Sequence, residues 1–440
     1  MVRNSGYADL PLHTGTVPKW LADRMMVMGT LIVESIIENY GIDEVLVRLS
    51  DPLWFQSLGA VMGMDWHSSG ITTSVLYALK RGLNPRAKDL GLYVCGGRGK
   101  YSRMTPNELL SIGEKTGLNA CQLVNNSKLV AKVDNNAVQD GFQLYQHNFI
   151  VSKDGNWTVV QQGMNANSKT ARRYHWCSSN LNSFIEEPHS AVVGQNFGKI
   201  INLTDKEAKN TRNSILDLSL QDTQKVIKEI TQIGKPEREI LVMSGGKVQT
   251  INKSSKVMMQ PELFEEYSPQ IIHNQNEQVI EVKGRHIIMP HHHEVREEDV
   301  DLKRLGGVLA TAYENQPKTF EELMLTPGLG PRTLQSLTLV SEVIYGTPSR
   351  FKDPARFSFA HGGKDGHPFP VPLKIYDESI RVLRDSIEKS KLGYKEKSDC
   401  IKRLHQTALQ IEKNCEPEVD FQKAIEFEKE NSKNWHGRTC

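Results

Sequence analysis

A glycine and proline corner late in the chain constrains the fold more than any other stretch of the sequence. Its residues are Leu325-Thr326-Pro327-Gly328-Leu329-Gly330-Pro331-Arg332-Thr333. Proline is tolerated in the first turn of a helix, where the N–H that it lacks has no partner to lose. We therefore predict that one helix ends at Pro327 and that a second begins at Pro331, with a two-glycine hairpin between them. Its free N–H groups, the positive end of the second helix and Arg332 suit a negatively charged oxygen such as a nucleic-acid phosphate.

This corner resembles the helix-hairpin-helix element of DNA-repair enzymes and polymerases. Gly328 and Gly330 stand in the hairpin, with the apolar Leu329 between them. The resemblance is confined to this short stretch and implies binding to the DNA backbone through Gly328, Gly330, Arg332 and Thr333, without preference for a base sequence. A structural interpretation stays open beside it, because any tight corner between two helices favours Gly and Pro.

Length and composition place the rest of the chain. Its 440 residues, 38% of them hydrophobic and 24% charged, are typical of a globular protein with roughly two or three domains. The formal net charge of only +2 means that any basic footprint for DNA must be local. The N-terminus lacks the apolar core of a signal sequence and no apolar run is long enough for a membrane helix, so we expect a cytoplasmic protein without a membrane partner.

Apolar periodicity and turn residues predict an α+β fold that is predominantly helical. We expect a helical and α/β core with the candidate active site in residues 1–200. A polar middle segment follows in residues 201–300 with one apolar strand, Ile240 to Met243, and the sequence does not decide whether the segment is a helical insertion or a connector. The helix-hairpin-helix region would occupy residues 301–372. Two long amphipathic helices would follow in residues 373–440, and their mixed charges indicate solvated faces.

Local signals define some elements more closely. Leu92 to Cys95 form a short apolar run that enters the glycine-rich loop Gly96 to Lys100, which predicts a buried strand before a loop. The next helix would begin at Thr105, with Glu108 reaching back to form a capping box. Two further strands, Phe142 to Val151 and Trp157 to Gln161, are expected around an Asp-Gly turn.

Three clusters carry histidine outside any apolar period and offer ligands for a divalent metal such as Mg²⁺ or Mn²⁺. Asp65 and His67 stand two apart between helices, and His291 and His293 can face one ion from an extended segment. Lys364 lies in a third cluster, His361 to Pro368, whose glycines allow a ligand to approach closely. A histidine held by a loop hydrogen bond would explain the first cluster equally well.

A fourth polar cluster begins at Asp140. Gln143, Tyr145 and His147 alternate after it, so a strand would place them on one face and form a cleft. Lys169, Arg172 and Arg173 then precede aromatic residues, a combination that suits the phosphates and bases of a single-stranded or flipped nucleotide, although an exposed basic turn has the same composition. We take Asp140, His147 and His175 as candidate catalytic residues.

Known nuclease and glycosylase patterns fit only in part. Asp140 before polar β residues is similar to the metal site of restriction-like nucleases, but Gln161-Gln162 stands where their acidic-x-Lys pair would be. Base-excision glycosylases place an Asp after a helix-hairpin-helix element, yet Asp365 lies beyond their spacing and their hairpin lysine is absent.

Seven unusual motifs occur in order from about Gly15 to Lys391: WHSSG, GGRGK, DGFQLYQH, SKTARRYHW, PHHHE, PGLGPRT and AHGGKDGHPFPV. Together they resemble an uncharacterised prokaryotic family, a domain of unknown function (DUF763). The resemblance implies work on DNA through the hairpin and transfers no catalytic residue.

These observations favour a DNA-binding protein that acts as a metal-assisted phosphodiesterase, or nuclease, in DNA repair or processing. Lys169, Arg172, Arg173 and Lys364 would then contact phosphate. Two other interpretations stay open. The chain is a non-catalytic nucleic-acid-binding adaptor in one, and in the other it is a glycosylase-like or nucleotide-binding enzyme that uses the Gly96 to Lys100 loop.

Overall fold

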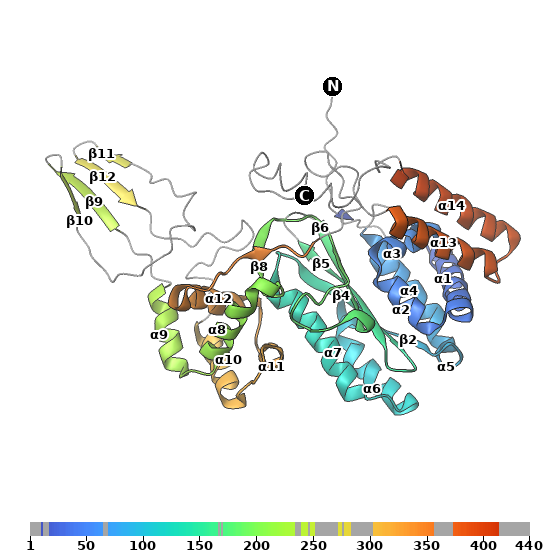
Figure 1. The fold of residues 1–440 in the computed structure, drawn as a ribbon, viewed down its shortest axis with the longest axis horizontal. Coiled ribbons are helices and arrows are strands. Elements are labelled where there is room, and N and C mark those ends of the chain that lie inside the picture. The colour runs from blue at the N-terminus through green and yellow to red at the C-terminus, as the bar shows by residue number, and fades with distance from the viewer. Residues whose placement is uncertain are drawn as a thin grey trace, which may run out of the picture. The chain divides into compact units, whose positions relative to one another are not determined.

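A computed structural model describes residues 10–11, 17–64, 69–165, 168, 170–233, 239–244, 247–250, 272–274, 277–282, 302–355 and 373–412. Contacts divide the chain into two compact units. The first unit joins Met1–Gly198 with Lys352–Cys440, and the second is Lys199–Phe351. Both contain helices and antiparallel strands (Figure 1), so the fold is α+β and predominantly helical, as predicted. No helix among the described residues is both long and apolar enough to span a membrane.

The first unit is built around an antiparallel sheet with the strand order β1-β6-β5-β4-β2, and β7 also pairs with β6. The strands are β1 (Leu10–Pro11), β2 (Leu92–Arg98), β4 (Gln143–Ser152), β5 (Trp157–Asn165), β6 (Thr170–Cys177) and β7 (Ala191–Val193). The short β3 (Val138–Gln139) precedes β4. The two central strands and their turn were predicted from the sequence.

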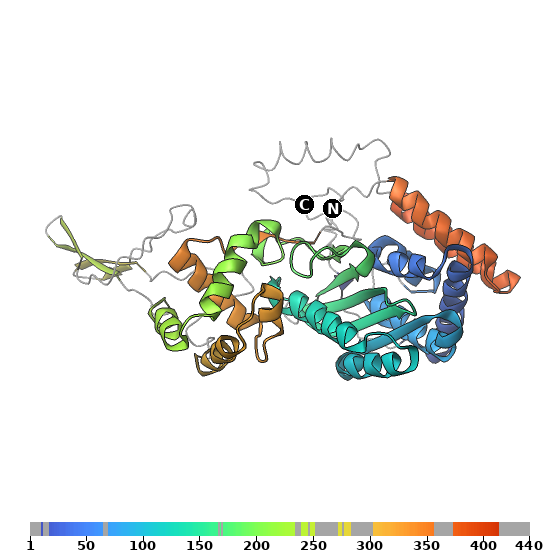
Figure 2. The same ribbon diagram turned by 60° about the horizontal axis from the view of Figure 1, so that its bottom comes forward.

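Helices cover both faces of this sheet. One layer contains α1 (Lys19–Tyr40), α2 (Ile42–Ser50), α3 (Pro52–Val61) and α4 (Gly70–Leu83). The other contains α6 (Thr105–Thr116) and α7 (Ala120–Lys132), which continues into one turn of π-helix, η3 (Val133–Ala137). Both views show the strands between the blue first layer and the cyan second layer (Figure 2). Shorter turns connect these elements: η1 (Asn84–Arg86), α5 (Ala87–Leu90), η2 (Gly99–Met104) and η4 (Ser178–Asn180).

The alternation of side chains along the strands separates two polar groups. His147 lies opposite Gln161 in the β4–β5 register, and Gln146 lies opposite Gln162. The His147 pair faces α7, where Gln161 Nε2 donates to Val130 O, whereas Gln162 Nε2 donates to Ser69 O beside α4. Successive residues of a strand point to opposite faces, so the two pairs belong to different helix layers.

A β-bulge between Leu144 and Gln146 changes one prediction. The hydroxyl of Tyr145 accepts a hydrogen bond of 2.5 Å from Gln162 Nε2, on the face opposite His147. The prediction that Tyr145 and His147 share a face was therefore wrong, because the extra residue of a bulge breaks the period of two.

The start of α6 corrects a second prediction. The Glu108 carboxylate does not reach back to its own helix but accepts hydrogen bonds from Gly96 N at 2.6 Å and from Lys80 Nζ at 2.7 Å. The Thr105 hydroxyl donates to Ser102 O. The capping box is absent, since Glu108 instead ties α6 to β2. Gly96 itself has a φ of 83°, and a Cβ there would lie 2.1 Å from His147 O, so close packing of β4 requires this glycine.

Two helices from the end of the chain complete the first unit. They are α13 (Leu373–Lys389) and α14 (Tyr394–Glu412), within the predicted residues 373–440. Both are buried along one face, where Leu383, Ile387 and Leu404 join the core formed by α1 to α4. On the charged face Arg381 and Arg384 are exposed, as their mixed charges indicated.

The second unit is a helical assembly with an attached sheet. Its helices are α8 (Lys209–Ser219), α9 (Thr223–Ile233), α10 (Leu302–Asn315), α11 (Phe320–Leu325) and α12 (Pro331–Tyr345). Four antiparallel strands in the order β10-β9-β12-β11 form the sheet. They are β9 (Glu239–Ser244), β10 (Lys247–Thr250), β11 (Ile272–Asn274) and β12 (Glu277–Val282). Short elements at its ends are β8 (Lys199–Asn202), η5 (Lys206–Ala208) and β13 (Phe351–Lys352). The polar middle segment thus contains a small sheet, of which the sequence analysis predicted only β9.

Candidate functional site

The predicted corner between two helices is present in the second unit. Helix α11 ends at Leu325 and α12 begins at Pro331, and we call residues 326–330 between them the glycine corner. Gly328 has a φ of 81° and is exposed, while Leu329 is only 4% exposed. Leu323 and Leu337 are buried on the two helices, so the apolar residues of this region pack inward and the glycine faces solvent.

The N-cap of α12 is Gly330, in an extended conformation with φ −123° and ψ 177°, and this residue gives the helix no side-chain cap. The first N–H groups of a helix have no partner within the helix and carry partial positive charge. Arg332 is exposed in the first turn, whereas Thr333 is 7% exposed. Three of the four predicted contact residues, Gly328, Gly330 and Arg332, therefore lie around one accessible surface.

Asp140 lies in the interior of the first unit, in an ionic cluster with two other charged residues. Arg172 Nη1 donates to Asp140 Oδ2 at 2.8 Å, and Arg172 also holds Asp353 through bonds of 2.9 Å and 3.0 Å. The Tyr174 hydroxyl donates to the same Asp140 oxygen at 2.6 Å. All three charged side chains have no exposed surface. Burial raises the pKa of Asp140, against the lowering effect of the Arg172 charge.

His175 and Arg173 form a second buried group, on the face of α2 and α3. Arg173 Nε donates to His175 Nε2 at 2.8 Å, so the proton of the neutral imidazole is on Nδ1, 3.1 Å from Leu49 O. Arg173 also donates to Gln56 Oε1 at 2.9 Å and lies over the Phe55 ring. Burial and the Arg173 charge lower the pKa of His175 well below its usual value. Both nitrogens of this imidazole are occupied by protein contacts.

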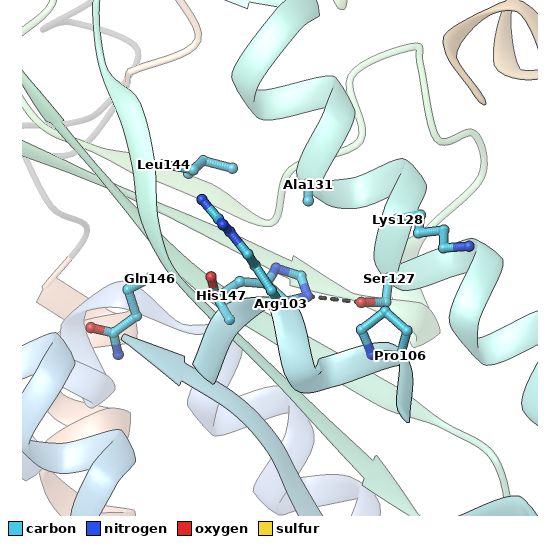
Figure 3. Close-up of a pocket in the computed structure, with 9 residues that line it drawn as sticks. Arg103, Pro106, Ser127, Lys128, Ala131, Leu144, Gln146 and His147 are labelled. Atoms are coloured by element: carbon cyan, nitrogen blue, oxygen red, sulfur yellow. Dashed lines mark hydrogen bonds between the residues drawn. The ribbon is translucent and has the colours of Figure 1, made fainter. Parts of the chain in front are cut away.

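His147, unlike Asp140 and His175 in their buried groups, lines a pocket that the structure shows. The pocket has a volume of about 220 Å³ and lies between η2, α7 and β4 (Figure 3). Besides His147 it is lined by Ser102, Arg103, Pro106, Ser127, Lys128, Ala131, Leu144 and Gln146. Arg103 and Lys128 are exposed, so the rim of the pocket carries two cations. A space of this size suits a small group such as a phosphate rather than a whole drug-sized ligand.

The imidazole of His147 is held at both nitrogens. Nε2 lies 2.9 Å from the Ser127 hydroxyl oxygen, and Nδ1 lies 2.6 Å from Gln161 Oε1. Burial lowers the pKa of His147, against the hydrogen bond to Gln161 and the charge of Asp134. The ring is therefore neutral near pH 7 and can accept a proton, which is the condition for a general base.

The structure does not bring the three candidate catalytic residues together. His147 and His175 lie on opposite faces of the sheet, since their partners in β5, Gln161 and Val160, are successive residues. Asp140 is enclosed by its own ion pairs. Arg172 and Arg173, expected to contact phosphate, instead contact protein groups in the interior, because β6 is buried along its whole length.

The other predicted positions fall outside the described residues. They are the metal ligands Asp65, His67, His291 and His293 and the phosphate contacts Lys169 and Lys364. Within the described ranges, no group of three or more His, Cys, Asp or Glu side chains is arranged to hold a metal ion.

Sequence reasoning missed Ser127, and with it the hydrogen-bond chain of His147. A signal was present, because Ser127 shares the buried face of α7 with Leu123 and Val130. A polar residue within an apolar stripe requires a partner in the interior. The identity of that partner could not be read from α7 alone.

Comparison with known proteins gives a family assignment. No curated protein and no solved structure matches the chain. A family model described as "Protein of unknown function (DUF763)" matches residues 6–371. That match spans most of the chain, with all of the second unit and most of the first, and the chain therefore belongs to the DUF763 family.

Proposed function

We propose that this protein binds the phosphodiester backbone of DNA at the glycine corner and hydrolyses phosphodiester bonds in DNA repair or processing. The observation that carries the proposal is the N-terminus of α12, to which the N-cap residue gives no side-chain cap, with an exposed glycine turn before it and the exposed Arg332 in its first turn. Backbone N–H groups and one guanidinium would contact phosphate oxygens and would make no contact that distinguishes one base from another. Binding would therefore be independent of base sequence, and it would weaken as the salt concentration rises.

The hydrolytic part of the proposal rests on His147. It is a neutral imidazole at a small pocket with the cations Arg103 and Lys128 on its rim. Such a group can take a proton from an attacking hydroxyl while the cations stabilise the charge on phosphate. Assistance by Mg²⁺ or Mn²⁺ through Asp65, His67, His291 and His293 stays a prediction, and comparing cleavage with and without chelator tests it.

The binding proposal is tested by a substitution that occupies the site without harming the fold. Asp is a preferred N-cap residue, so the carboxylate introduced by Gly330→Asp would accept hydrogen bonds from the N–H groups in the first turn of α12. It would also place a negative charge where we expect the phosphate to bind. We expect equal or higher thermal stability together with at least about tenfold weaker binding to labelled DNA. Arg332→Ala should reduce the slope of log K against log salt by about one.

Lys209→Ala is the matched control, because Lys209 is an exposed cation of the same unit at the start of α8. It should change neither the affinity nor the slope. Unaltered binding by Gly330→Asp would overturn the proposal and leave the corner as a structural hairpin. Binding at the corner without cleavage of single- or double-stranded DNA, with or without Mn²⁺, would identify the protein as a non-catalytic adaptor.

A further inference from the structure

A chain of hydrogen bonds leads from the pocket into the interior of the first unit. It runs from the Ser127 hydroxyl to His147, then to the Gln161 side chain, and ends at Asp134. Ser127 and His147 line the pocket (Figure 3), whereas Gln161 and Asp134 have no exposed surface. The residues come from α7, β4, β5 and η3, so the fold assembles the chain from four elements.

The direction of the bonds in this hydrogen-bond chain follows from the orientation of the Gln161 amide. Gln161 Nε2 donates to Val130 O, a carbonyl oxygen that can only accept, and to Asp134 Oδ2, so the Gln161 carbonyl oxygen is turned toward His147. The indole N–H of Trp176 donates to the same Asp134 oxygen at 2.9 Å, and His189 Nε2 lies 2.5 Å from Oδ1. The Gln161 carbonyl oxygen requires a proton on His147 Nδ1. The Nε2 lone pair is thereby left to accept the Ser127 proton.

The hydrogen bond of Ser127 differs from those of several other hydroxyls on helices of this protein. The hydroxyls of Thr30, Thr338 and Ser386 donate to the carbonyl oxygen four residues earlier. That bond is the usual way to satisfy a hydroxyl within a helix. Ser127 is instead directed at the imidazole, in the geometry of a nucleophile beside its base.

We propose that Ser127 is the nucleophile of a phosphodiester-cleaving site, that His147 is its general base, and that Gln161 and Asp134 are positioning residues. The inference rests on the proposed function for its substrate, a phosphodiester of single-stranded nucleic acid. Arg103 and Lys128 at the pocket rim match the charge of the phosphate. Tyr101 is 56% exposed in η2, two residues before Arg103, and offers a ring on which a base can stack.

The chemistry balances without a further reactant. The Ser127 oxygen forms a bond to phosphorus as its proton passes to His147 Nε2, and the bond from phosphorus to the leaving oxygen breaks. The leaving oxygen takes the proton from His147. In the second step a water oxygen attacks phosphorus and gives one proton to His147, the bond to Ser127 breaks, and the serine recovers that proton. The net reaction consumes one water and yields an alcohol and a phosphate monoester.

A fluorophosphonate probe tests the nucleophile directly on the full chain. An activated serine displaces fluoride and stays attached to phosphorus, so mass mapping should find the adduct on Ser127. Ser127→Ala should abolish the adduct, and His147→Gln should slow labelling at least about a hundredfold. Ser102→Ala is the matched control, since Ser102 lines the same pocket and donates to Gly99 O, and it should be labelled at the wild-type rate.

The pH profile tests the positioning residues. The labelling rate should fall when His147 becomes protonated. Because burial lowers the pKa of His147, this fall should have its midpoint at a pH below the usual pKa of an imidazole. The charge that acts on this ring is that of Asp134, which lies beyond Gln161, while Arg103 and Lys128 line the pocket. Asp134→Asn removes a charge that favours the imidazolium and should move the midpoint to lower pH. A structural role for Asp134 would change the amount of folded protein and leave the midpoint in place.

The outcomes separate this inference from the proposed function. An unlabelled Ser127 in folded protein overturns the nucleophile, whether or not Gly330→Asp weakens DNA binding. If Ser127 is labelled but the protein binds no DNA, the assignment of Ser127 as a nucleophile is supported and the assignment of DNA as its substrate is overturned. Tyr101→Ala should weaken cleavage of single-stranded DNA at unchanged labelling, and equal cleavage by this variant overturns the stacking platform.

Discussion

At the scale of single residues, the first unit holds a buried ionic cluster that joins parts of the chain far apart in sequence. Arg172 in β6 holds Asp140 before β4 and Asp353 after β13. The sequence identified Asp140 at the start of a polar stretch and Arg172 in a basic run before aromatic residues. The contact of Arg172 with Asp353 could not be predicted, since the two residues are 181 positions apart and no local pattern marks Asp353.

Removing the central cation should destabilise the first unit strongly. Arg172→Met leaves two buried carboxylates facing each other without compensation, which costs about 3–5 kcal/mol. Urea denaturation of the purified variant measures this loss. Arg384→Met is the control, because the Arg384 side chain is 60% exposed in a pair with Glu388 and should contribute less than about 1 kcal/mol. Equal midpoints for the two variants would mean that the ionic cluster contributes no stability.

Glu34 should make stability depend on pH in the acid range. Arg86 binds both oxygens of Glu34 at 2.7 Å and 2.9 Å, and its hydrogen bonds and charge lower the pKa of Glu34 from 4.5 to about 2. A depressed carboxylate pKa stabilises the folded state above the unfolded value, and this contribution is lost as pH falls from about 4.5 to about 2. Since Arg86 is 42% exposed, we expect about 1–2 kcal/mol after screening. The difference in unfolding free energy between wild type and Glu34→Gln should therefore shrink across this range, and a constant difference would contradict the assignment.

At the scale of elements, sequence patterns located the corner between α11 and α12, the start of α6 and both central strands. Proline and glycine set the ends of α11 and α12, and the Asp-Gly turn joins β4 to β5. The pattern could not show the bulge at Tyr145 or the bond of Glu108 to Gly96, because both depend on a neighbouring strand. Ser127 follows the same rule, since its role appears only when α7 packs on β4.

Gly328 in the glycine corner and Gly307 in α10 should respond in opposite ways to replacement by alanine. Gly328 has a φ of 81°, and a Cβ there would lie 3.1 Å from Val308 Cγ2. Gly328→Ala should therefore cost about 1–2 kcal/mol through the left-handed conformation alone. Gly307 lies within α10 with nothing near its added Cβ, so Gly307→Ala should stabilise the protein by about 0.5–1 kcal/mol. Thermal denaturation checks the opposite signs, and two shifts in the same direction would contradict the geometry of the corner.

At the scale of the whole molecule, the first unit is discontinuous, because the chain leaves it after Gly198 and returns at Lys352. The returning helices supply core side chains. Leu383 and Leu404 are buried in the same cluster as Met25 and Ile36 of α1, and Cys400 Sγ lies 3.3 Å from Met28 Sδ. Amphipathic periodicity predicted both helices but not their partner. The apolar face of an amphipathic helix can pack against any apolar surface, so the sequence alone does not show that α13 and α14 pack on α1 and α3.

The stability of the first unit should therefore depend on the last helices. Leu383→Ala removes a side chain with no exposed surface and should cost about 2–5 kcal/mol. Arg381→Ala, two positions away and 62% exposed, should change stability by less than about 0.5 kcal/mol. A chain that ends after Ala355 keeps Asp353 but loses α13 and α14, and it should expose the core surface of α1 and α3. Urea midpoints for the three proteins give the comparison, and a shortened chain as stable as the full one would show that the N-terminal helices need no cover from the C-terminal pair.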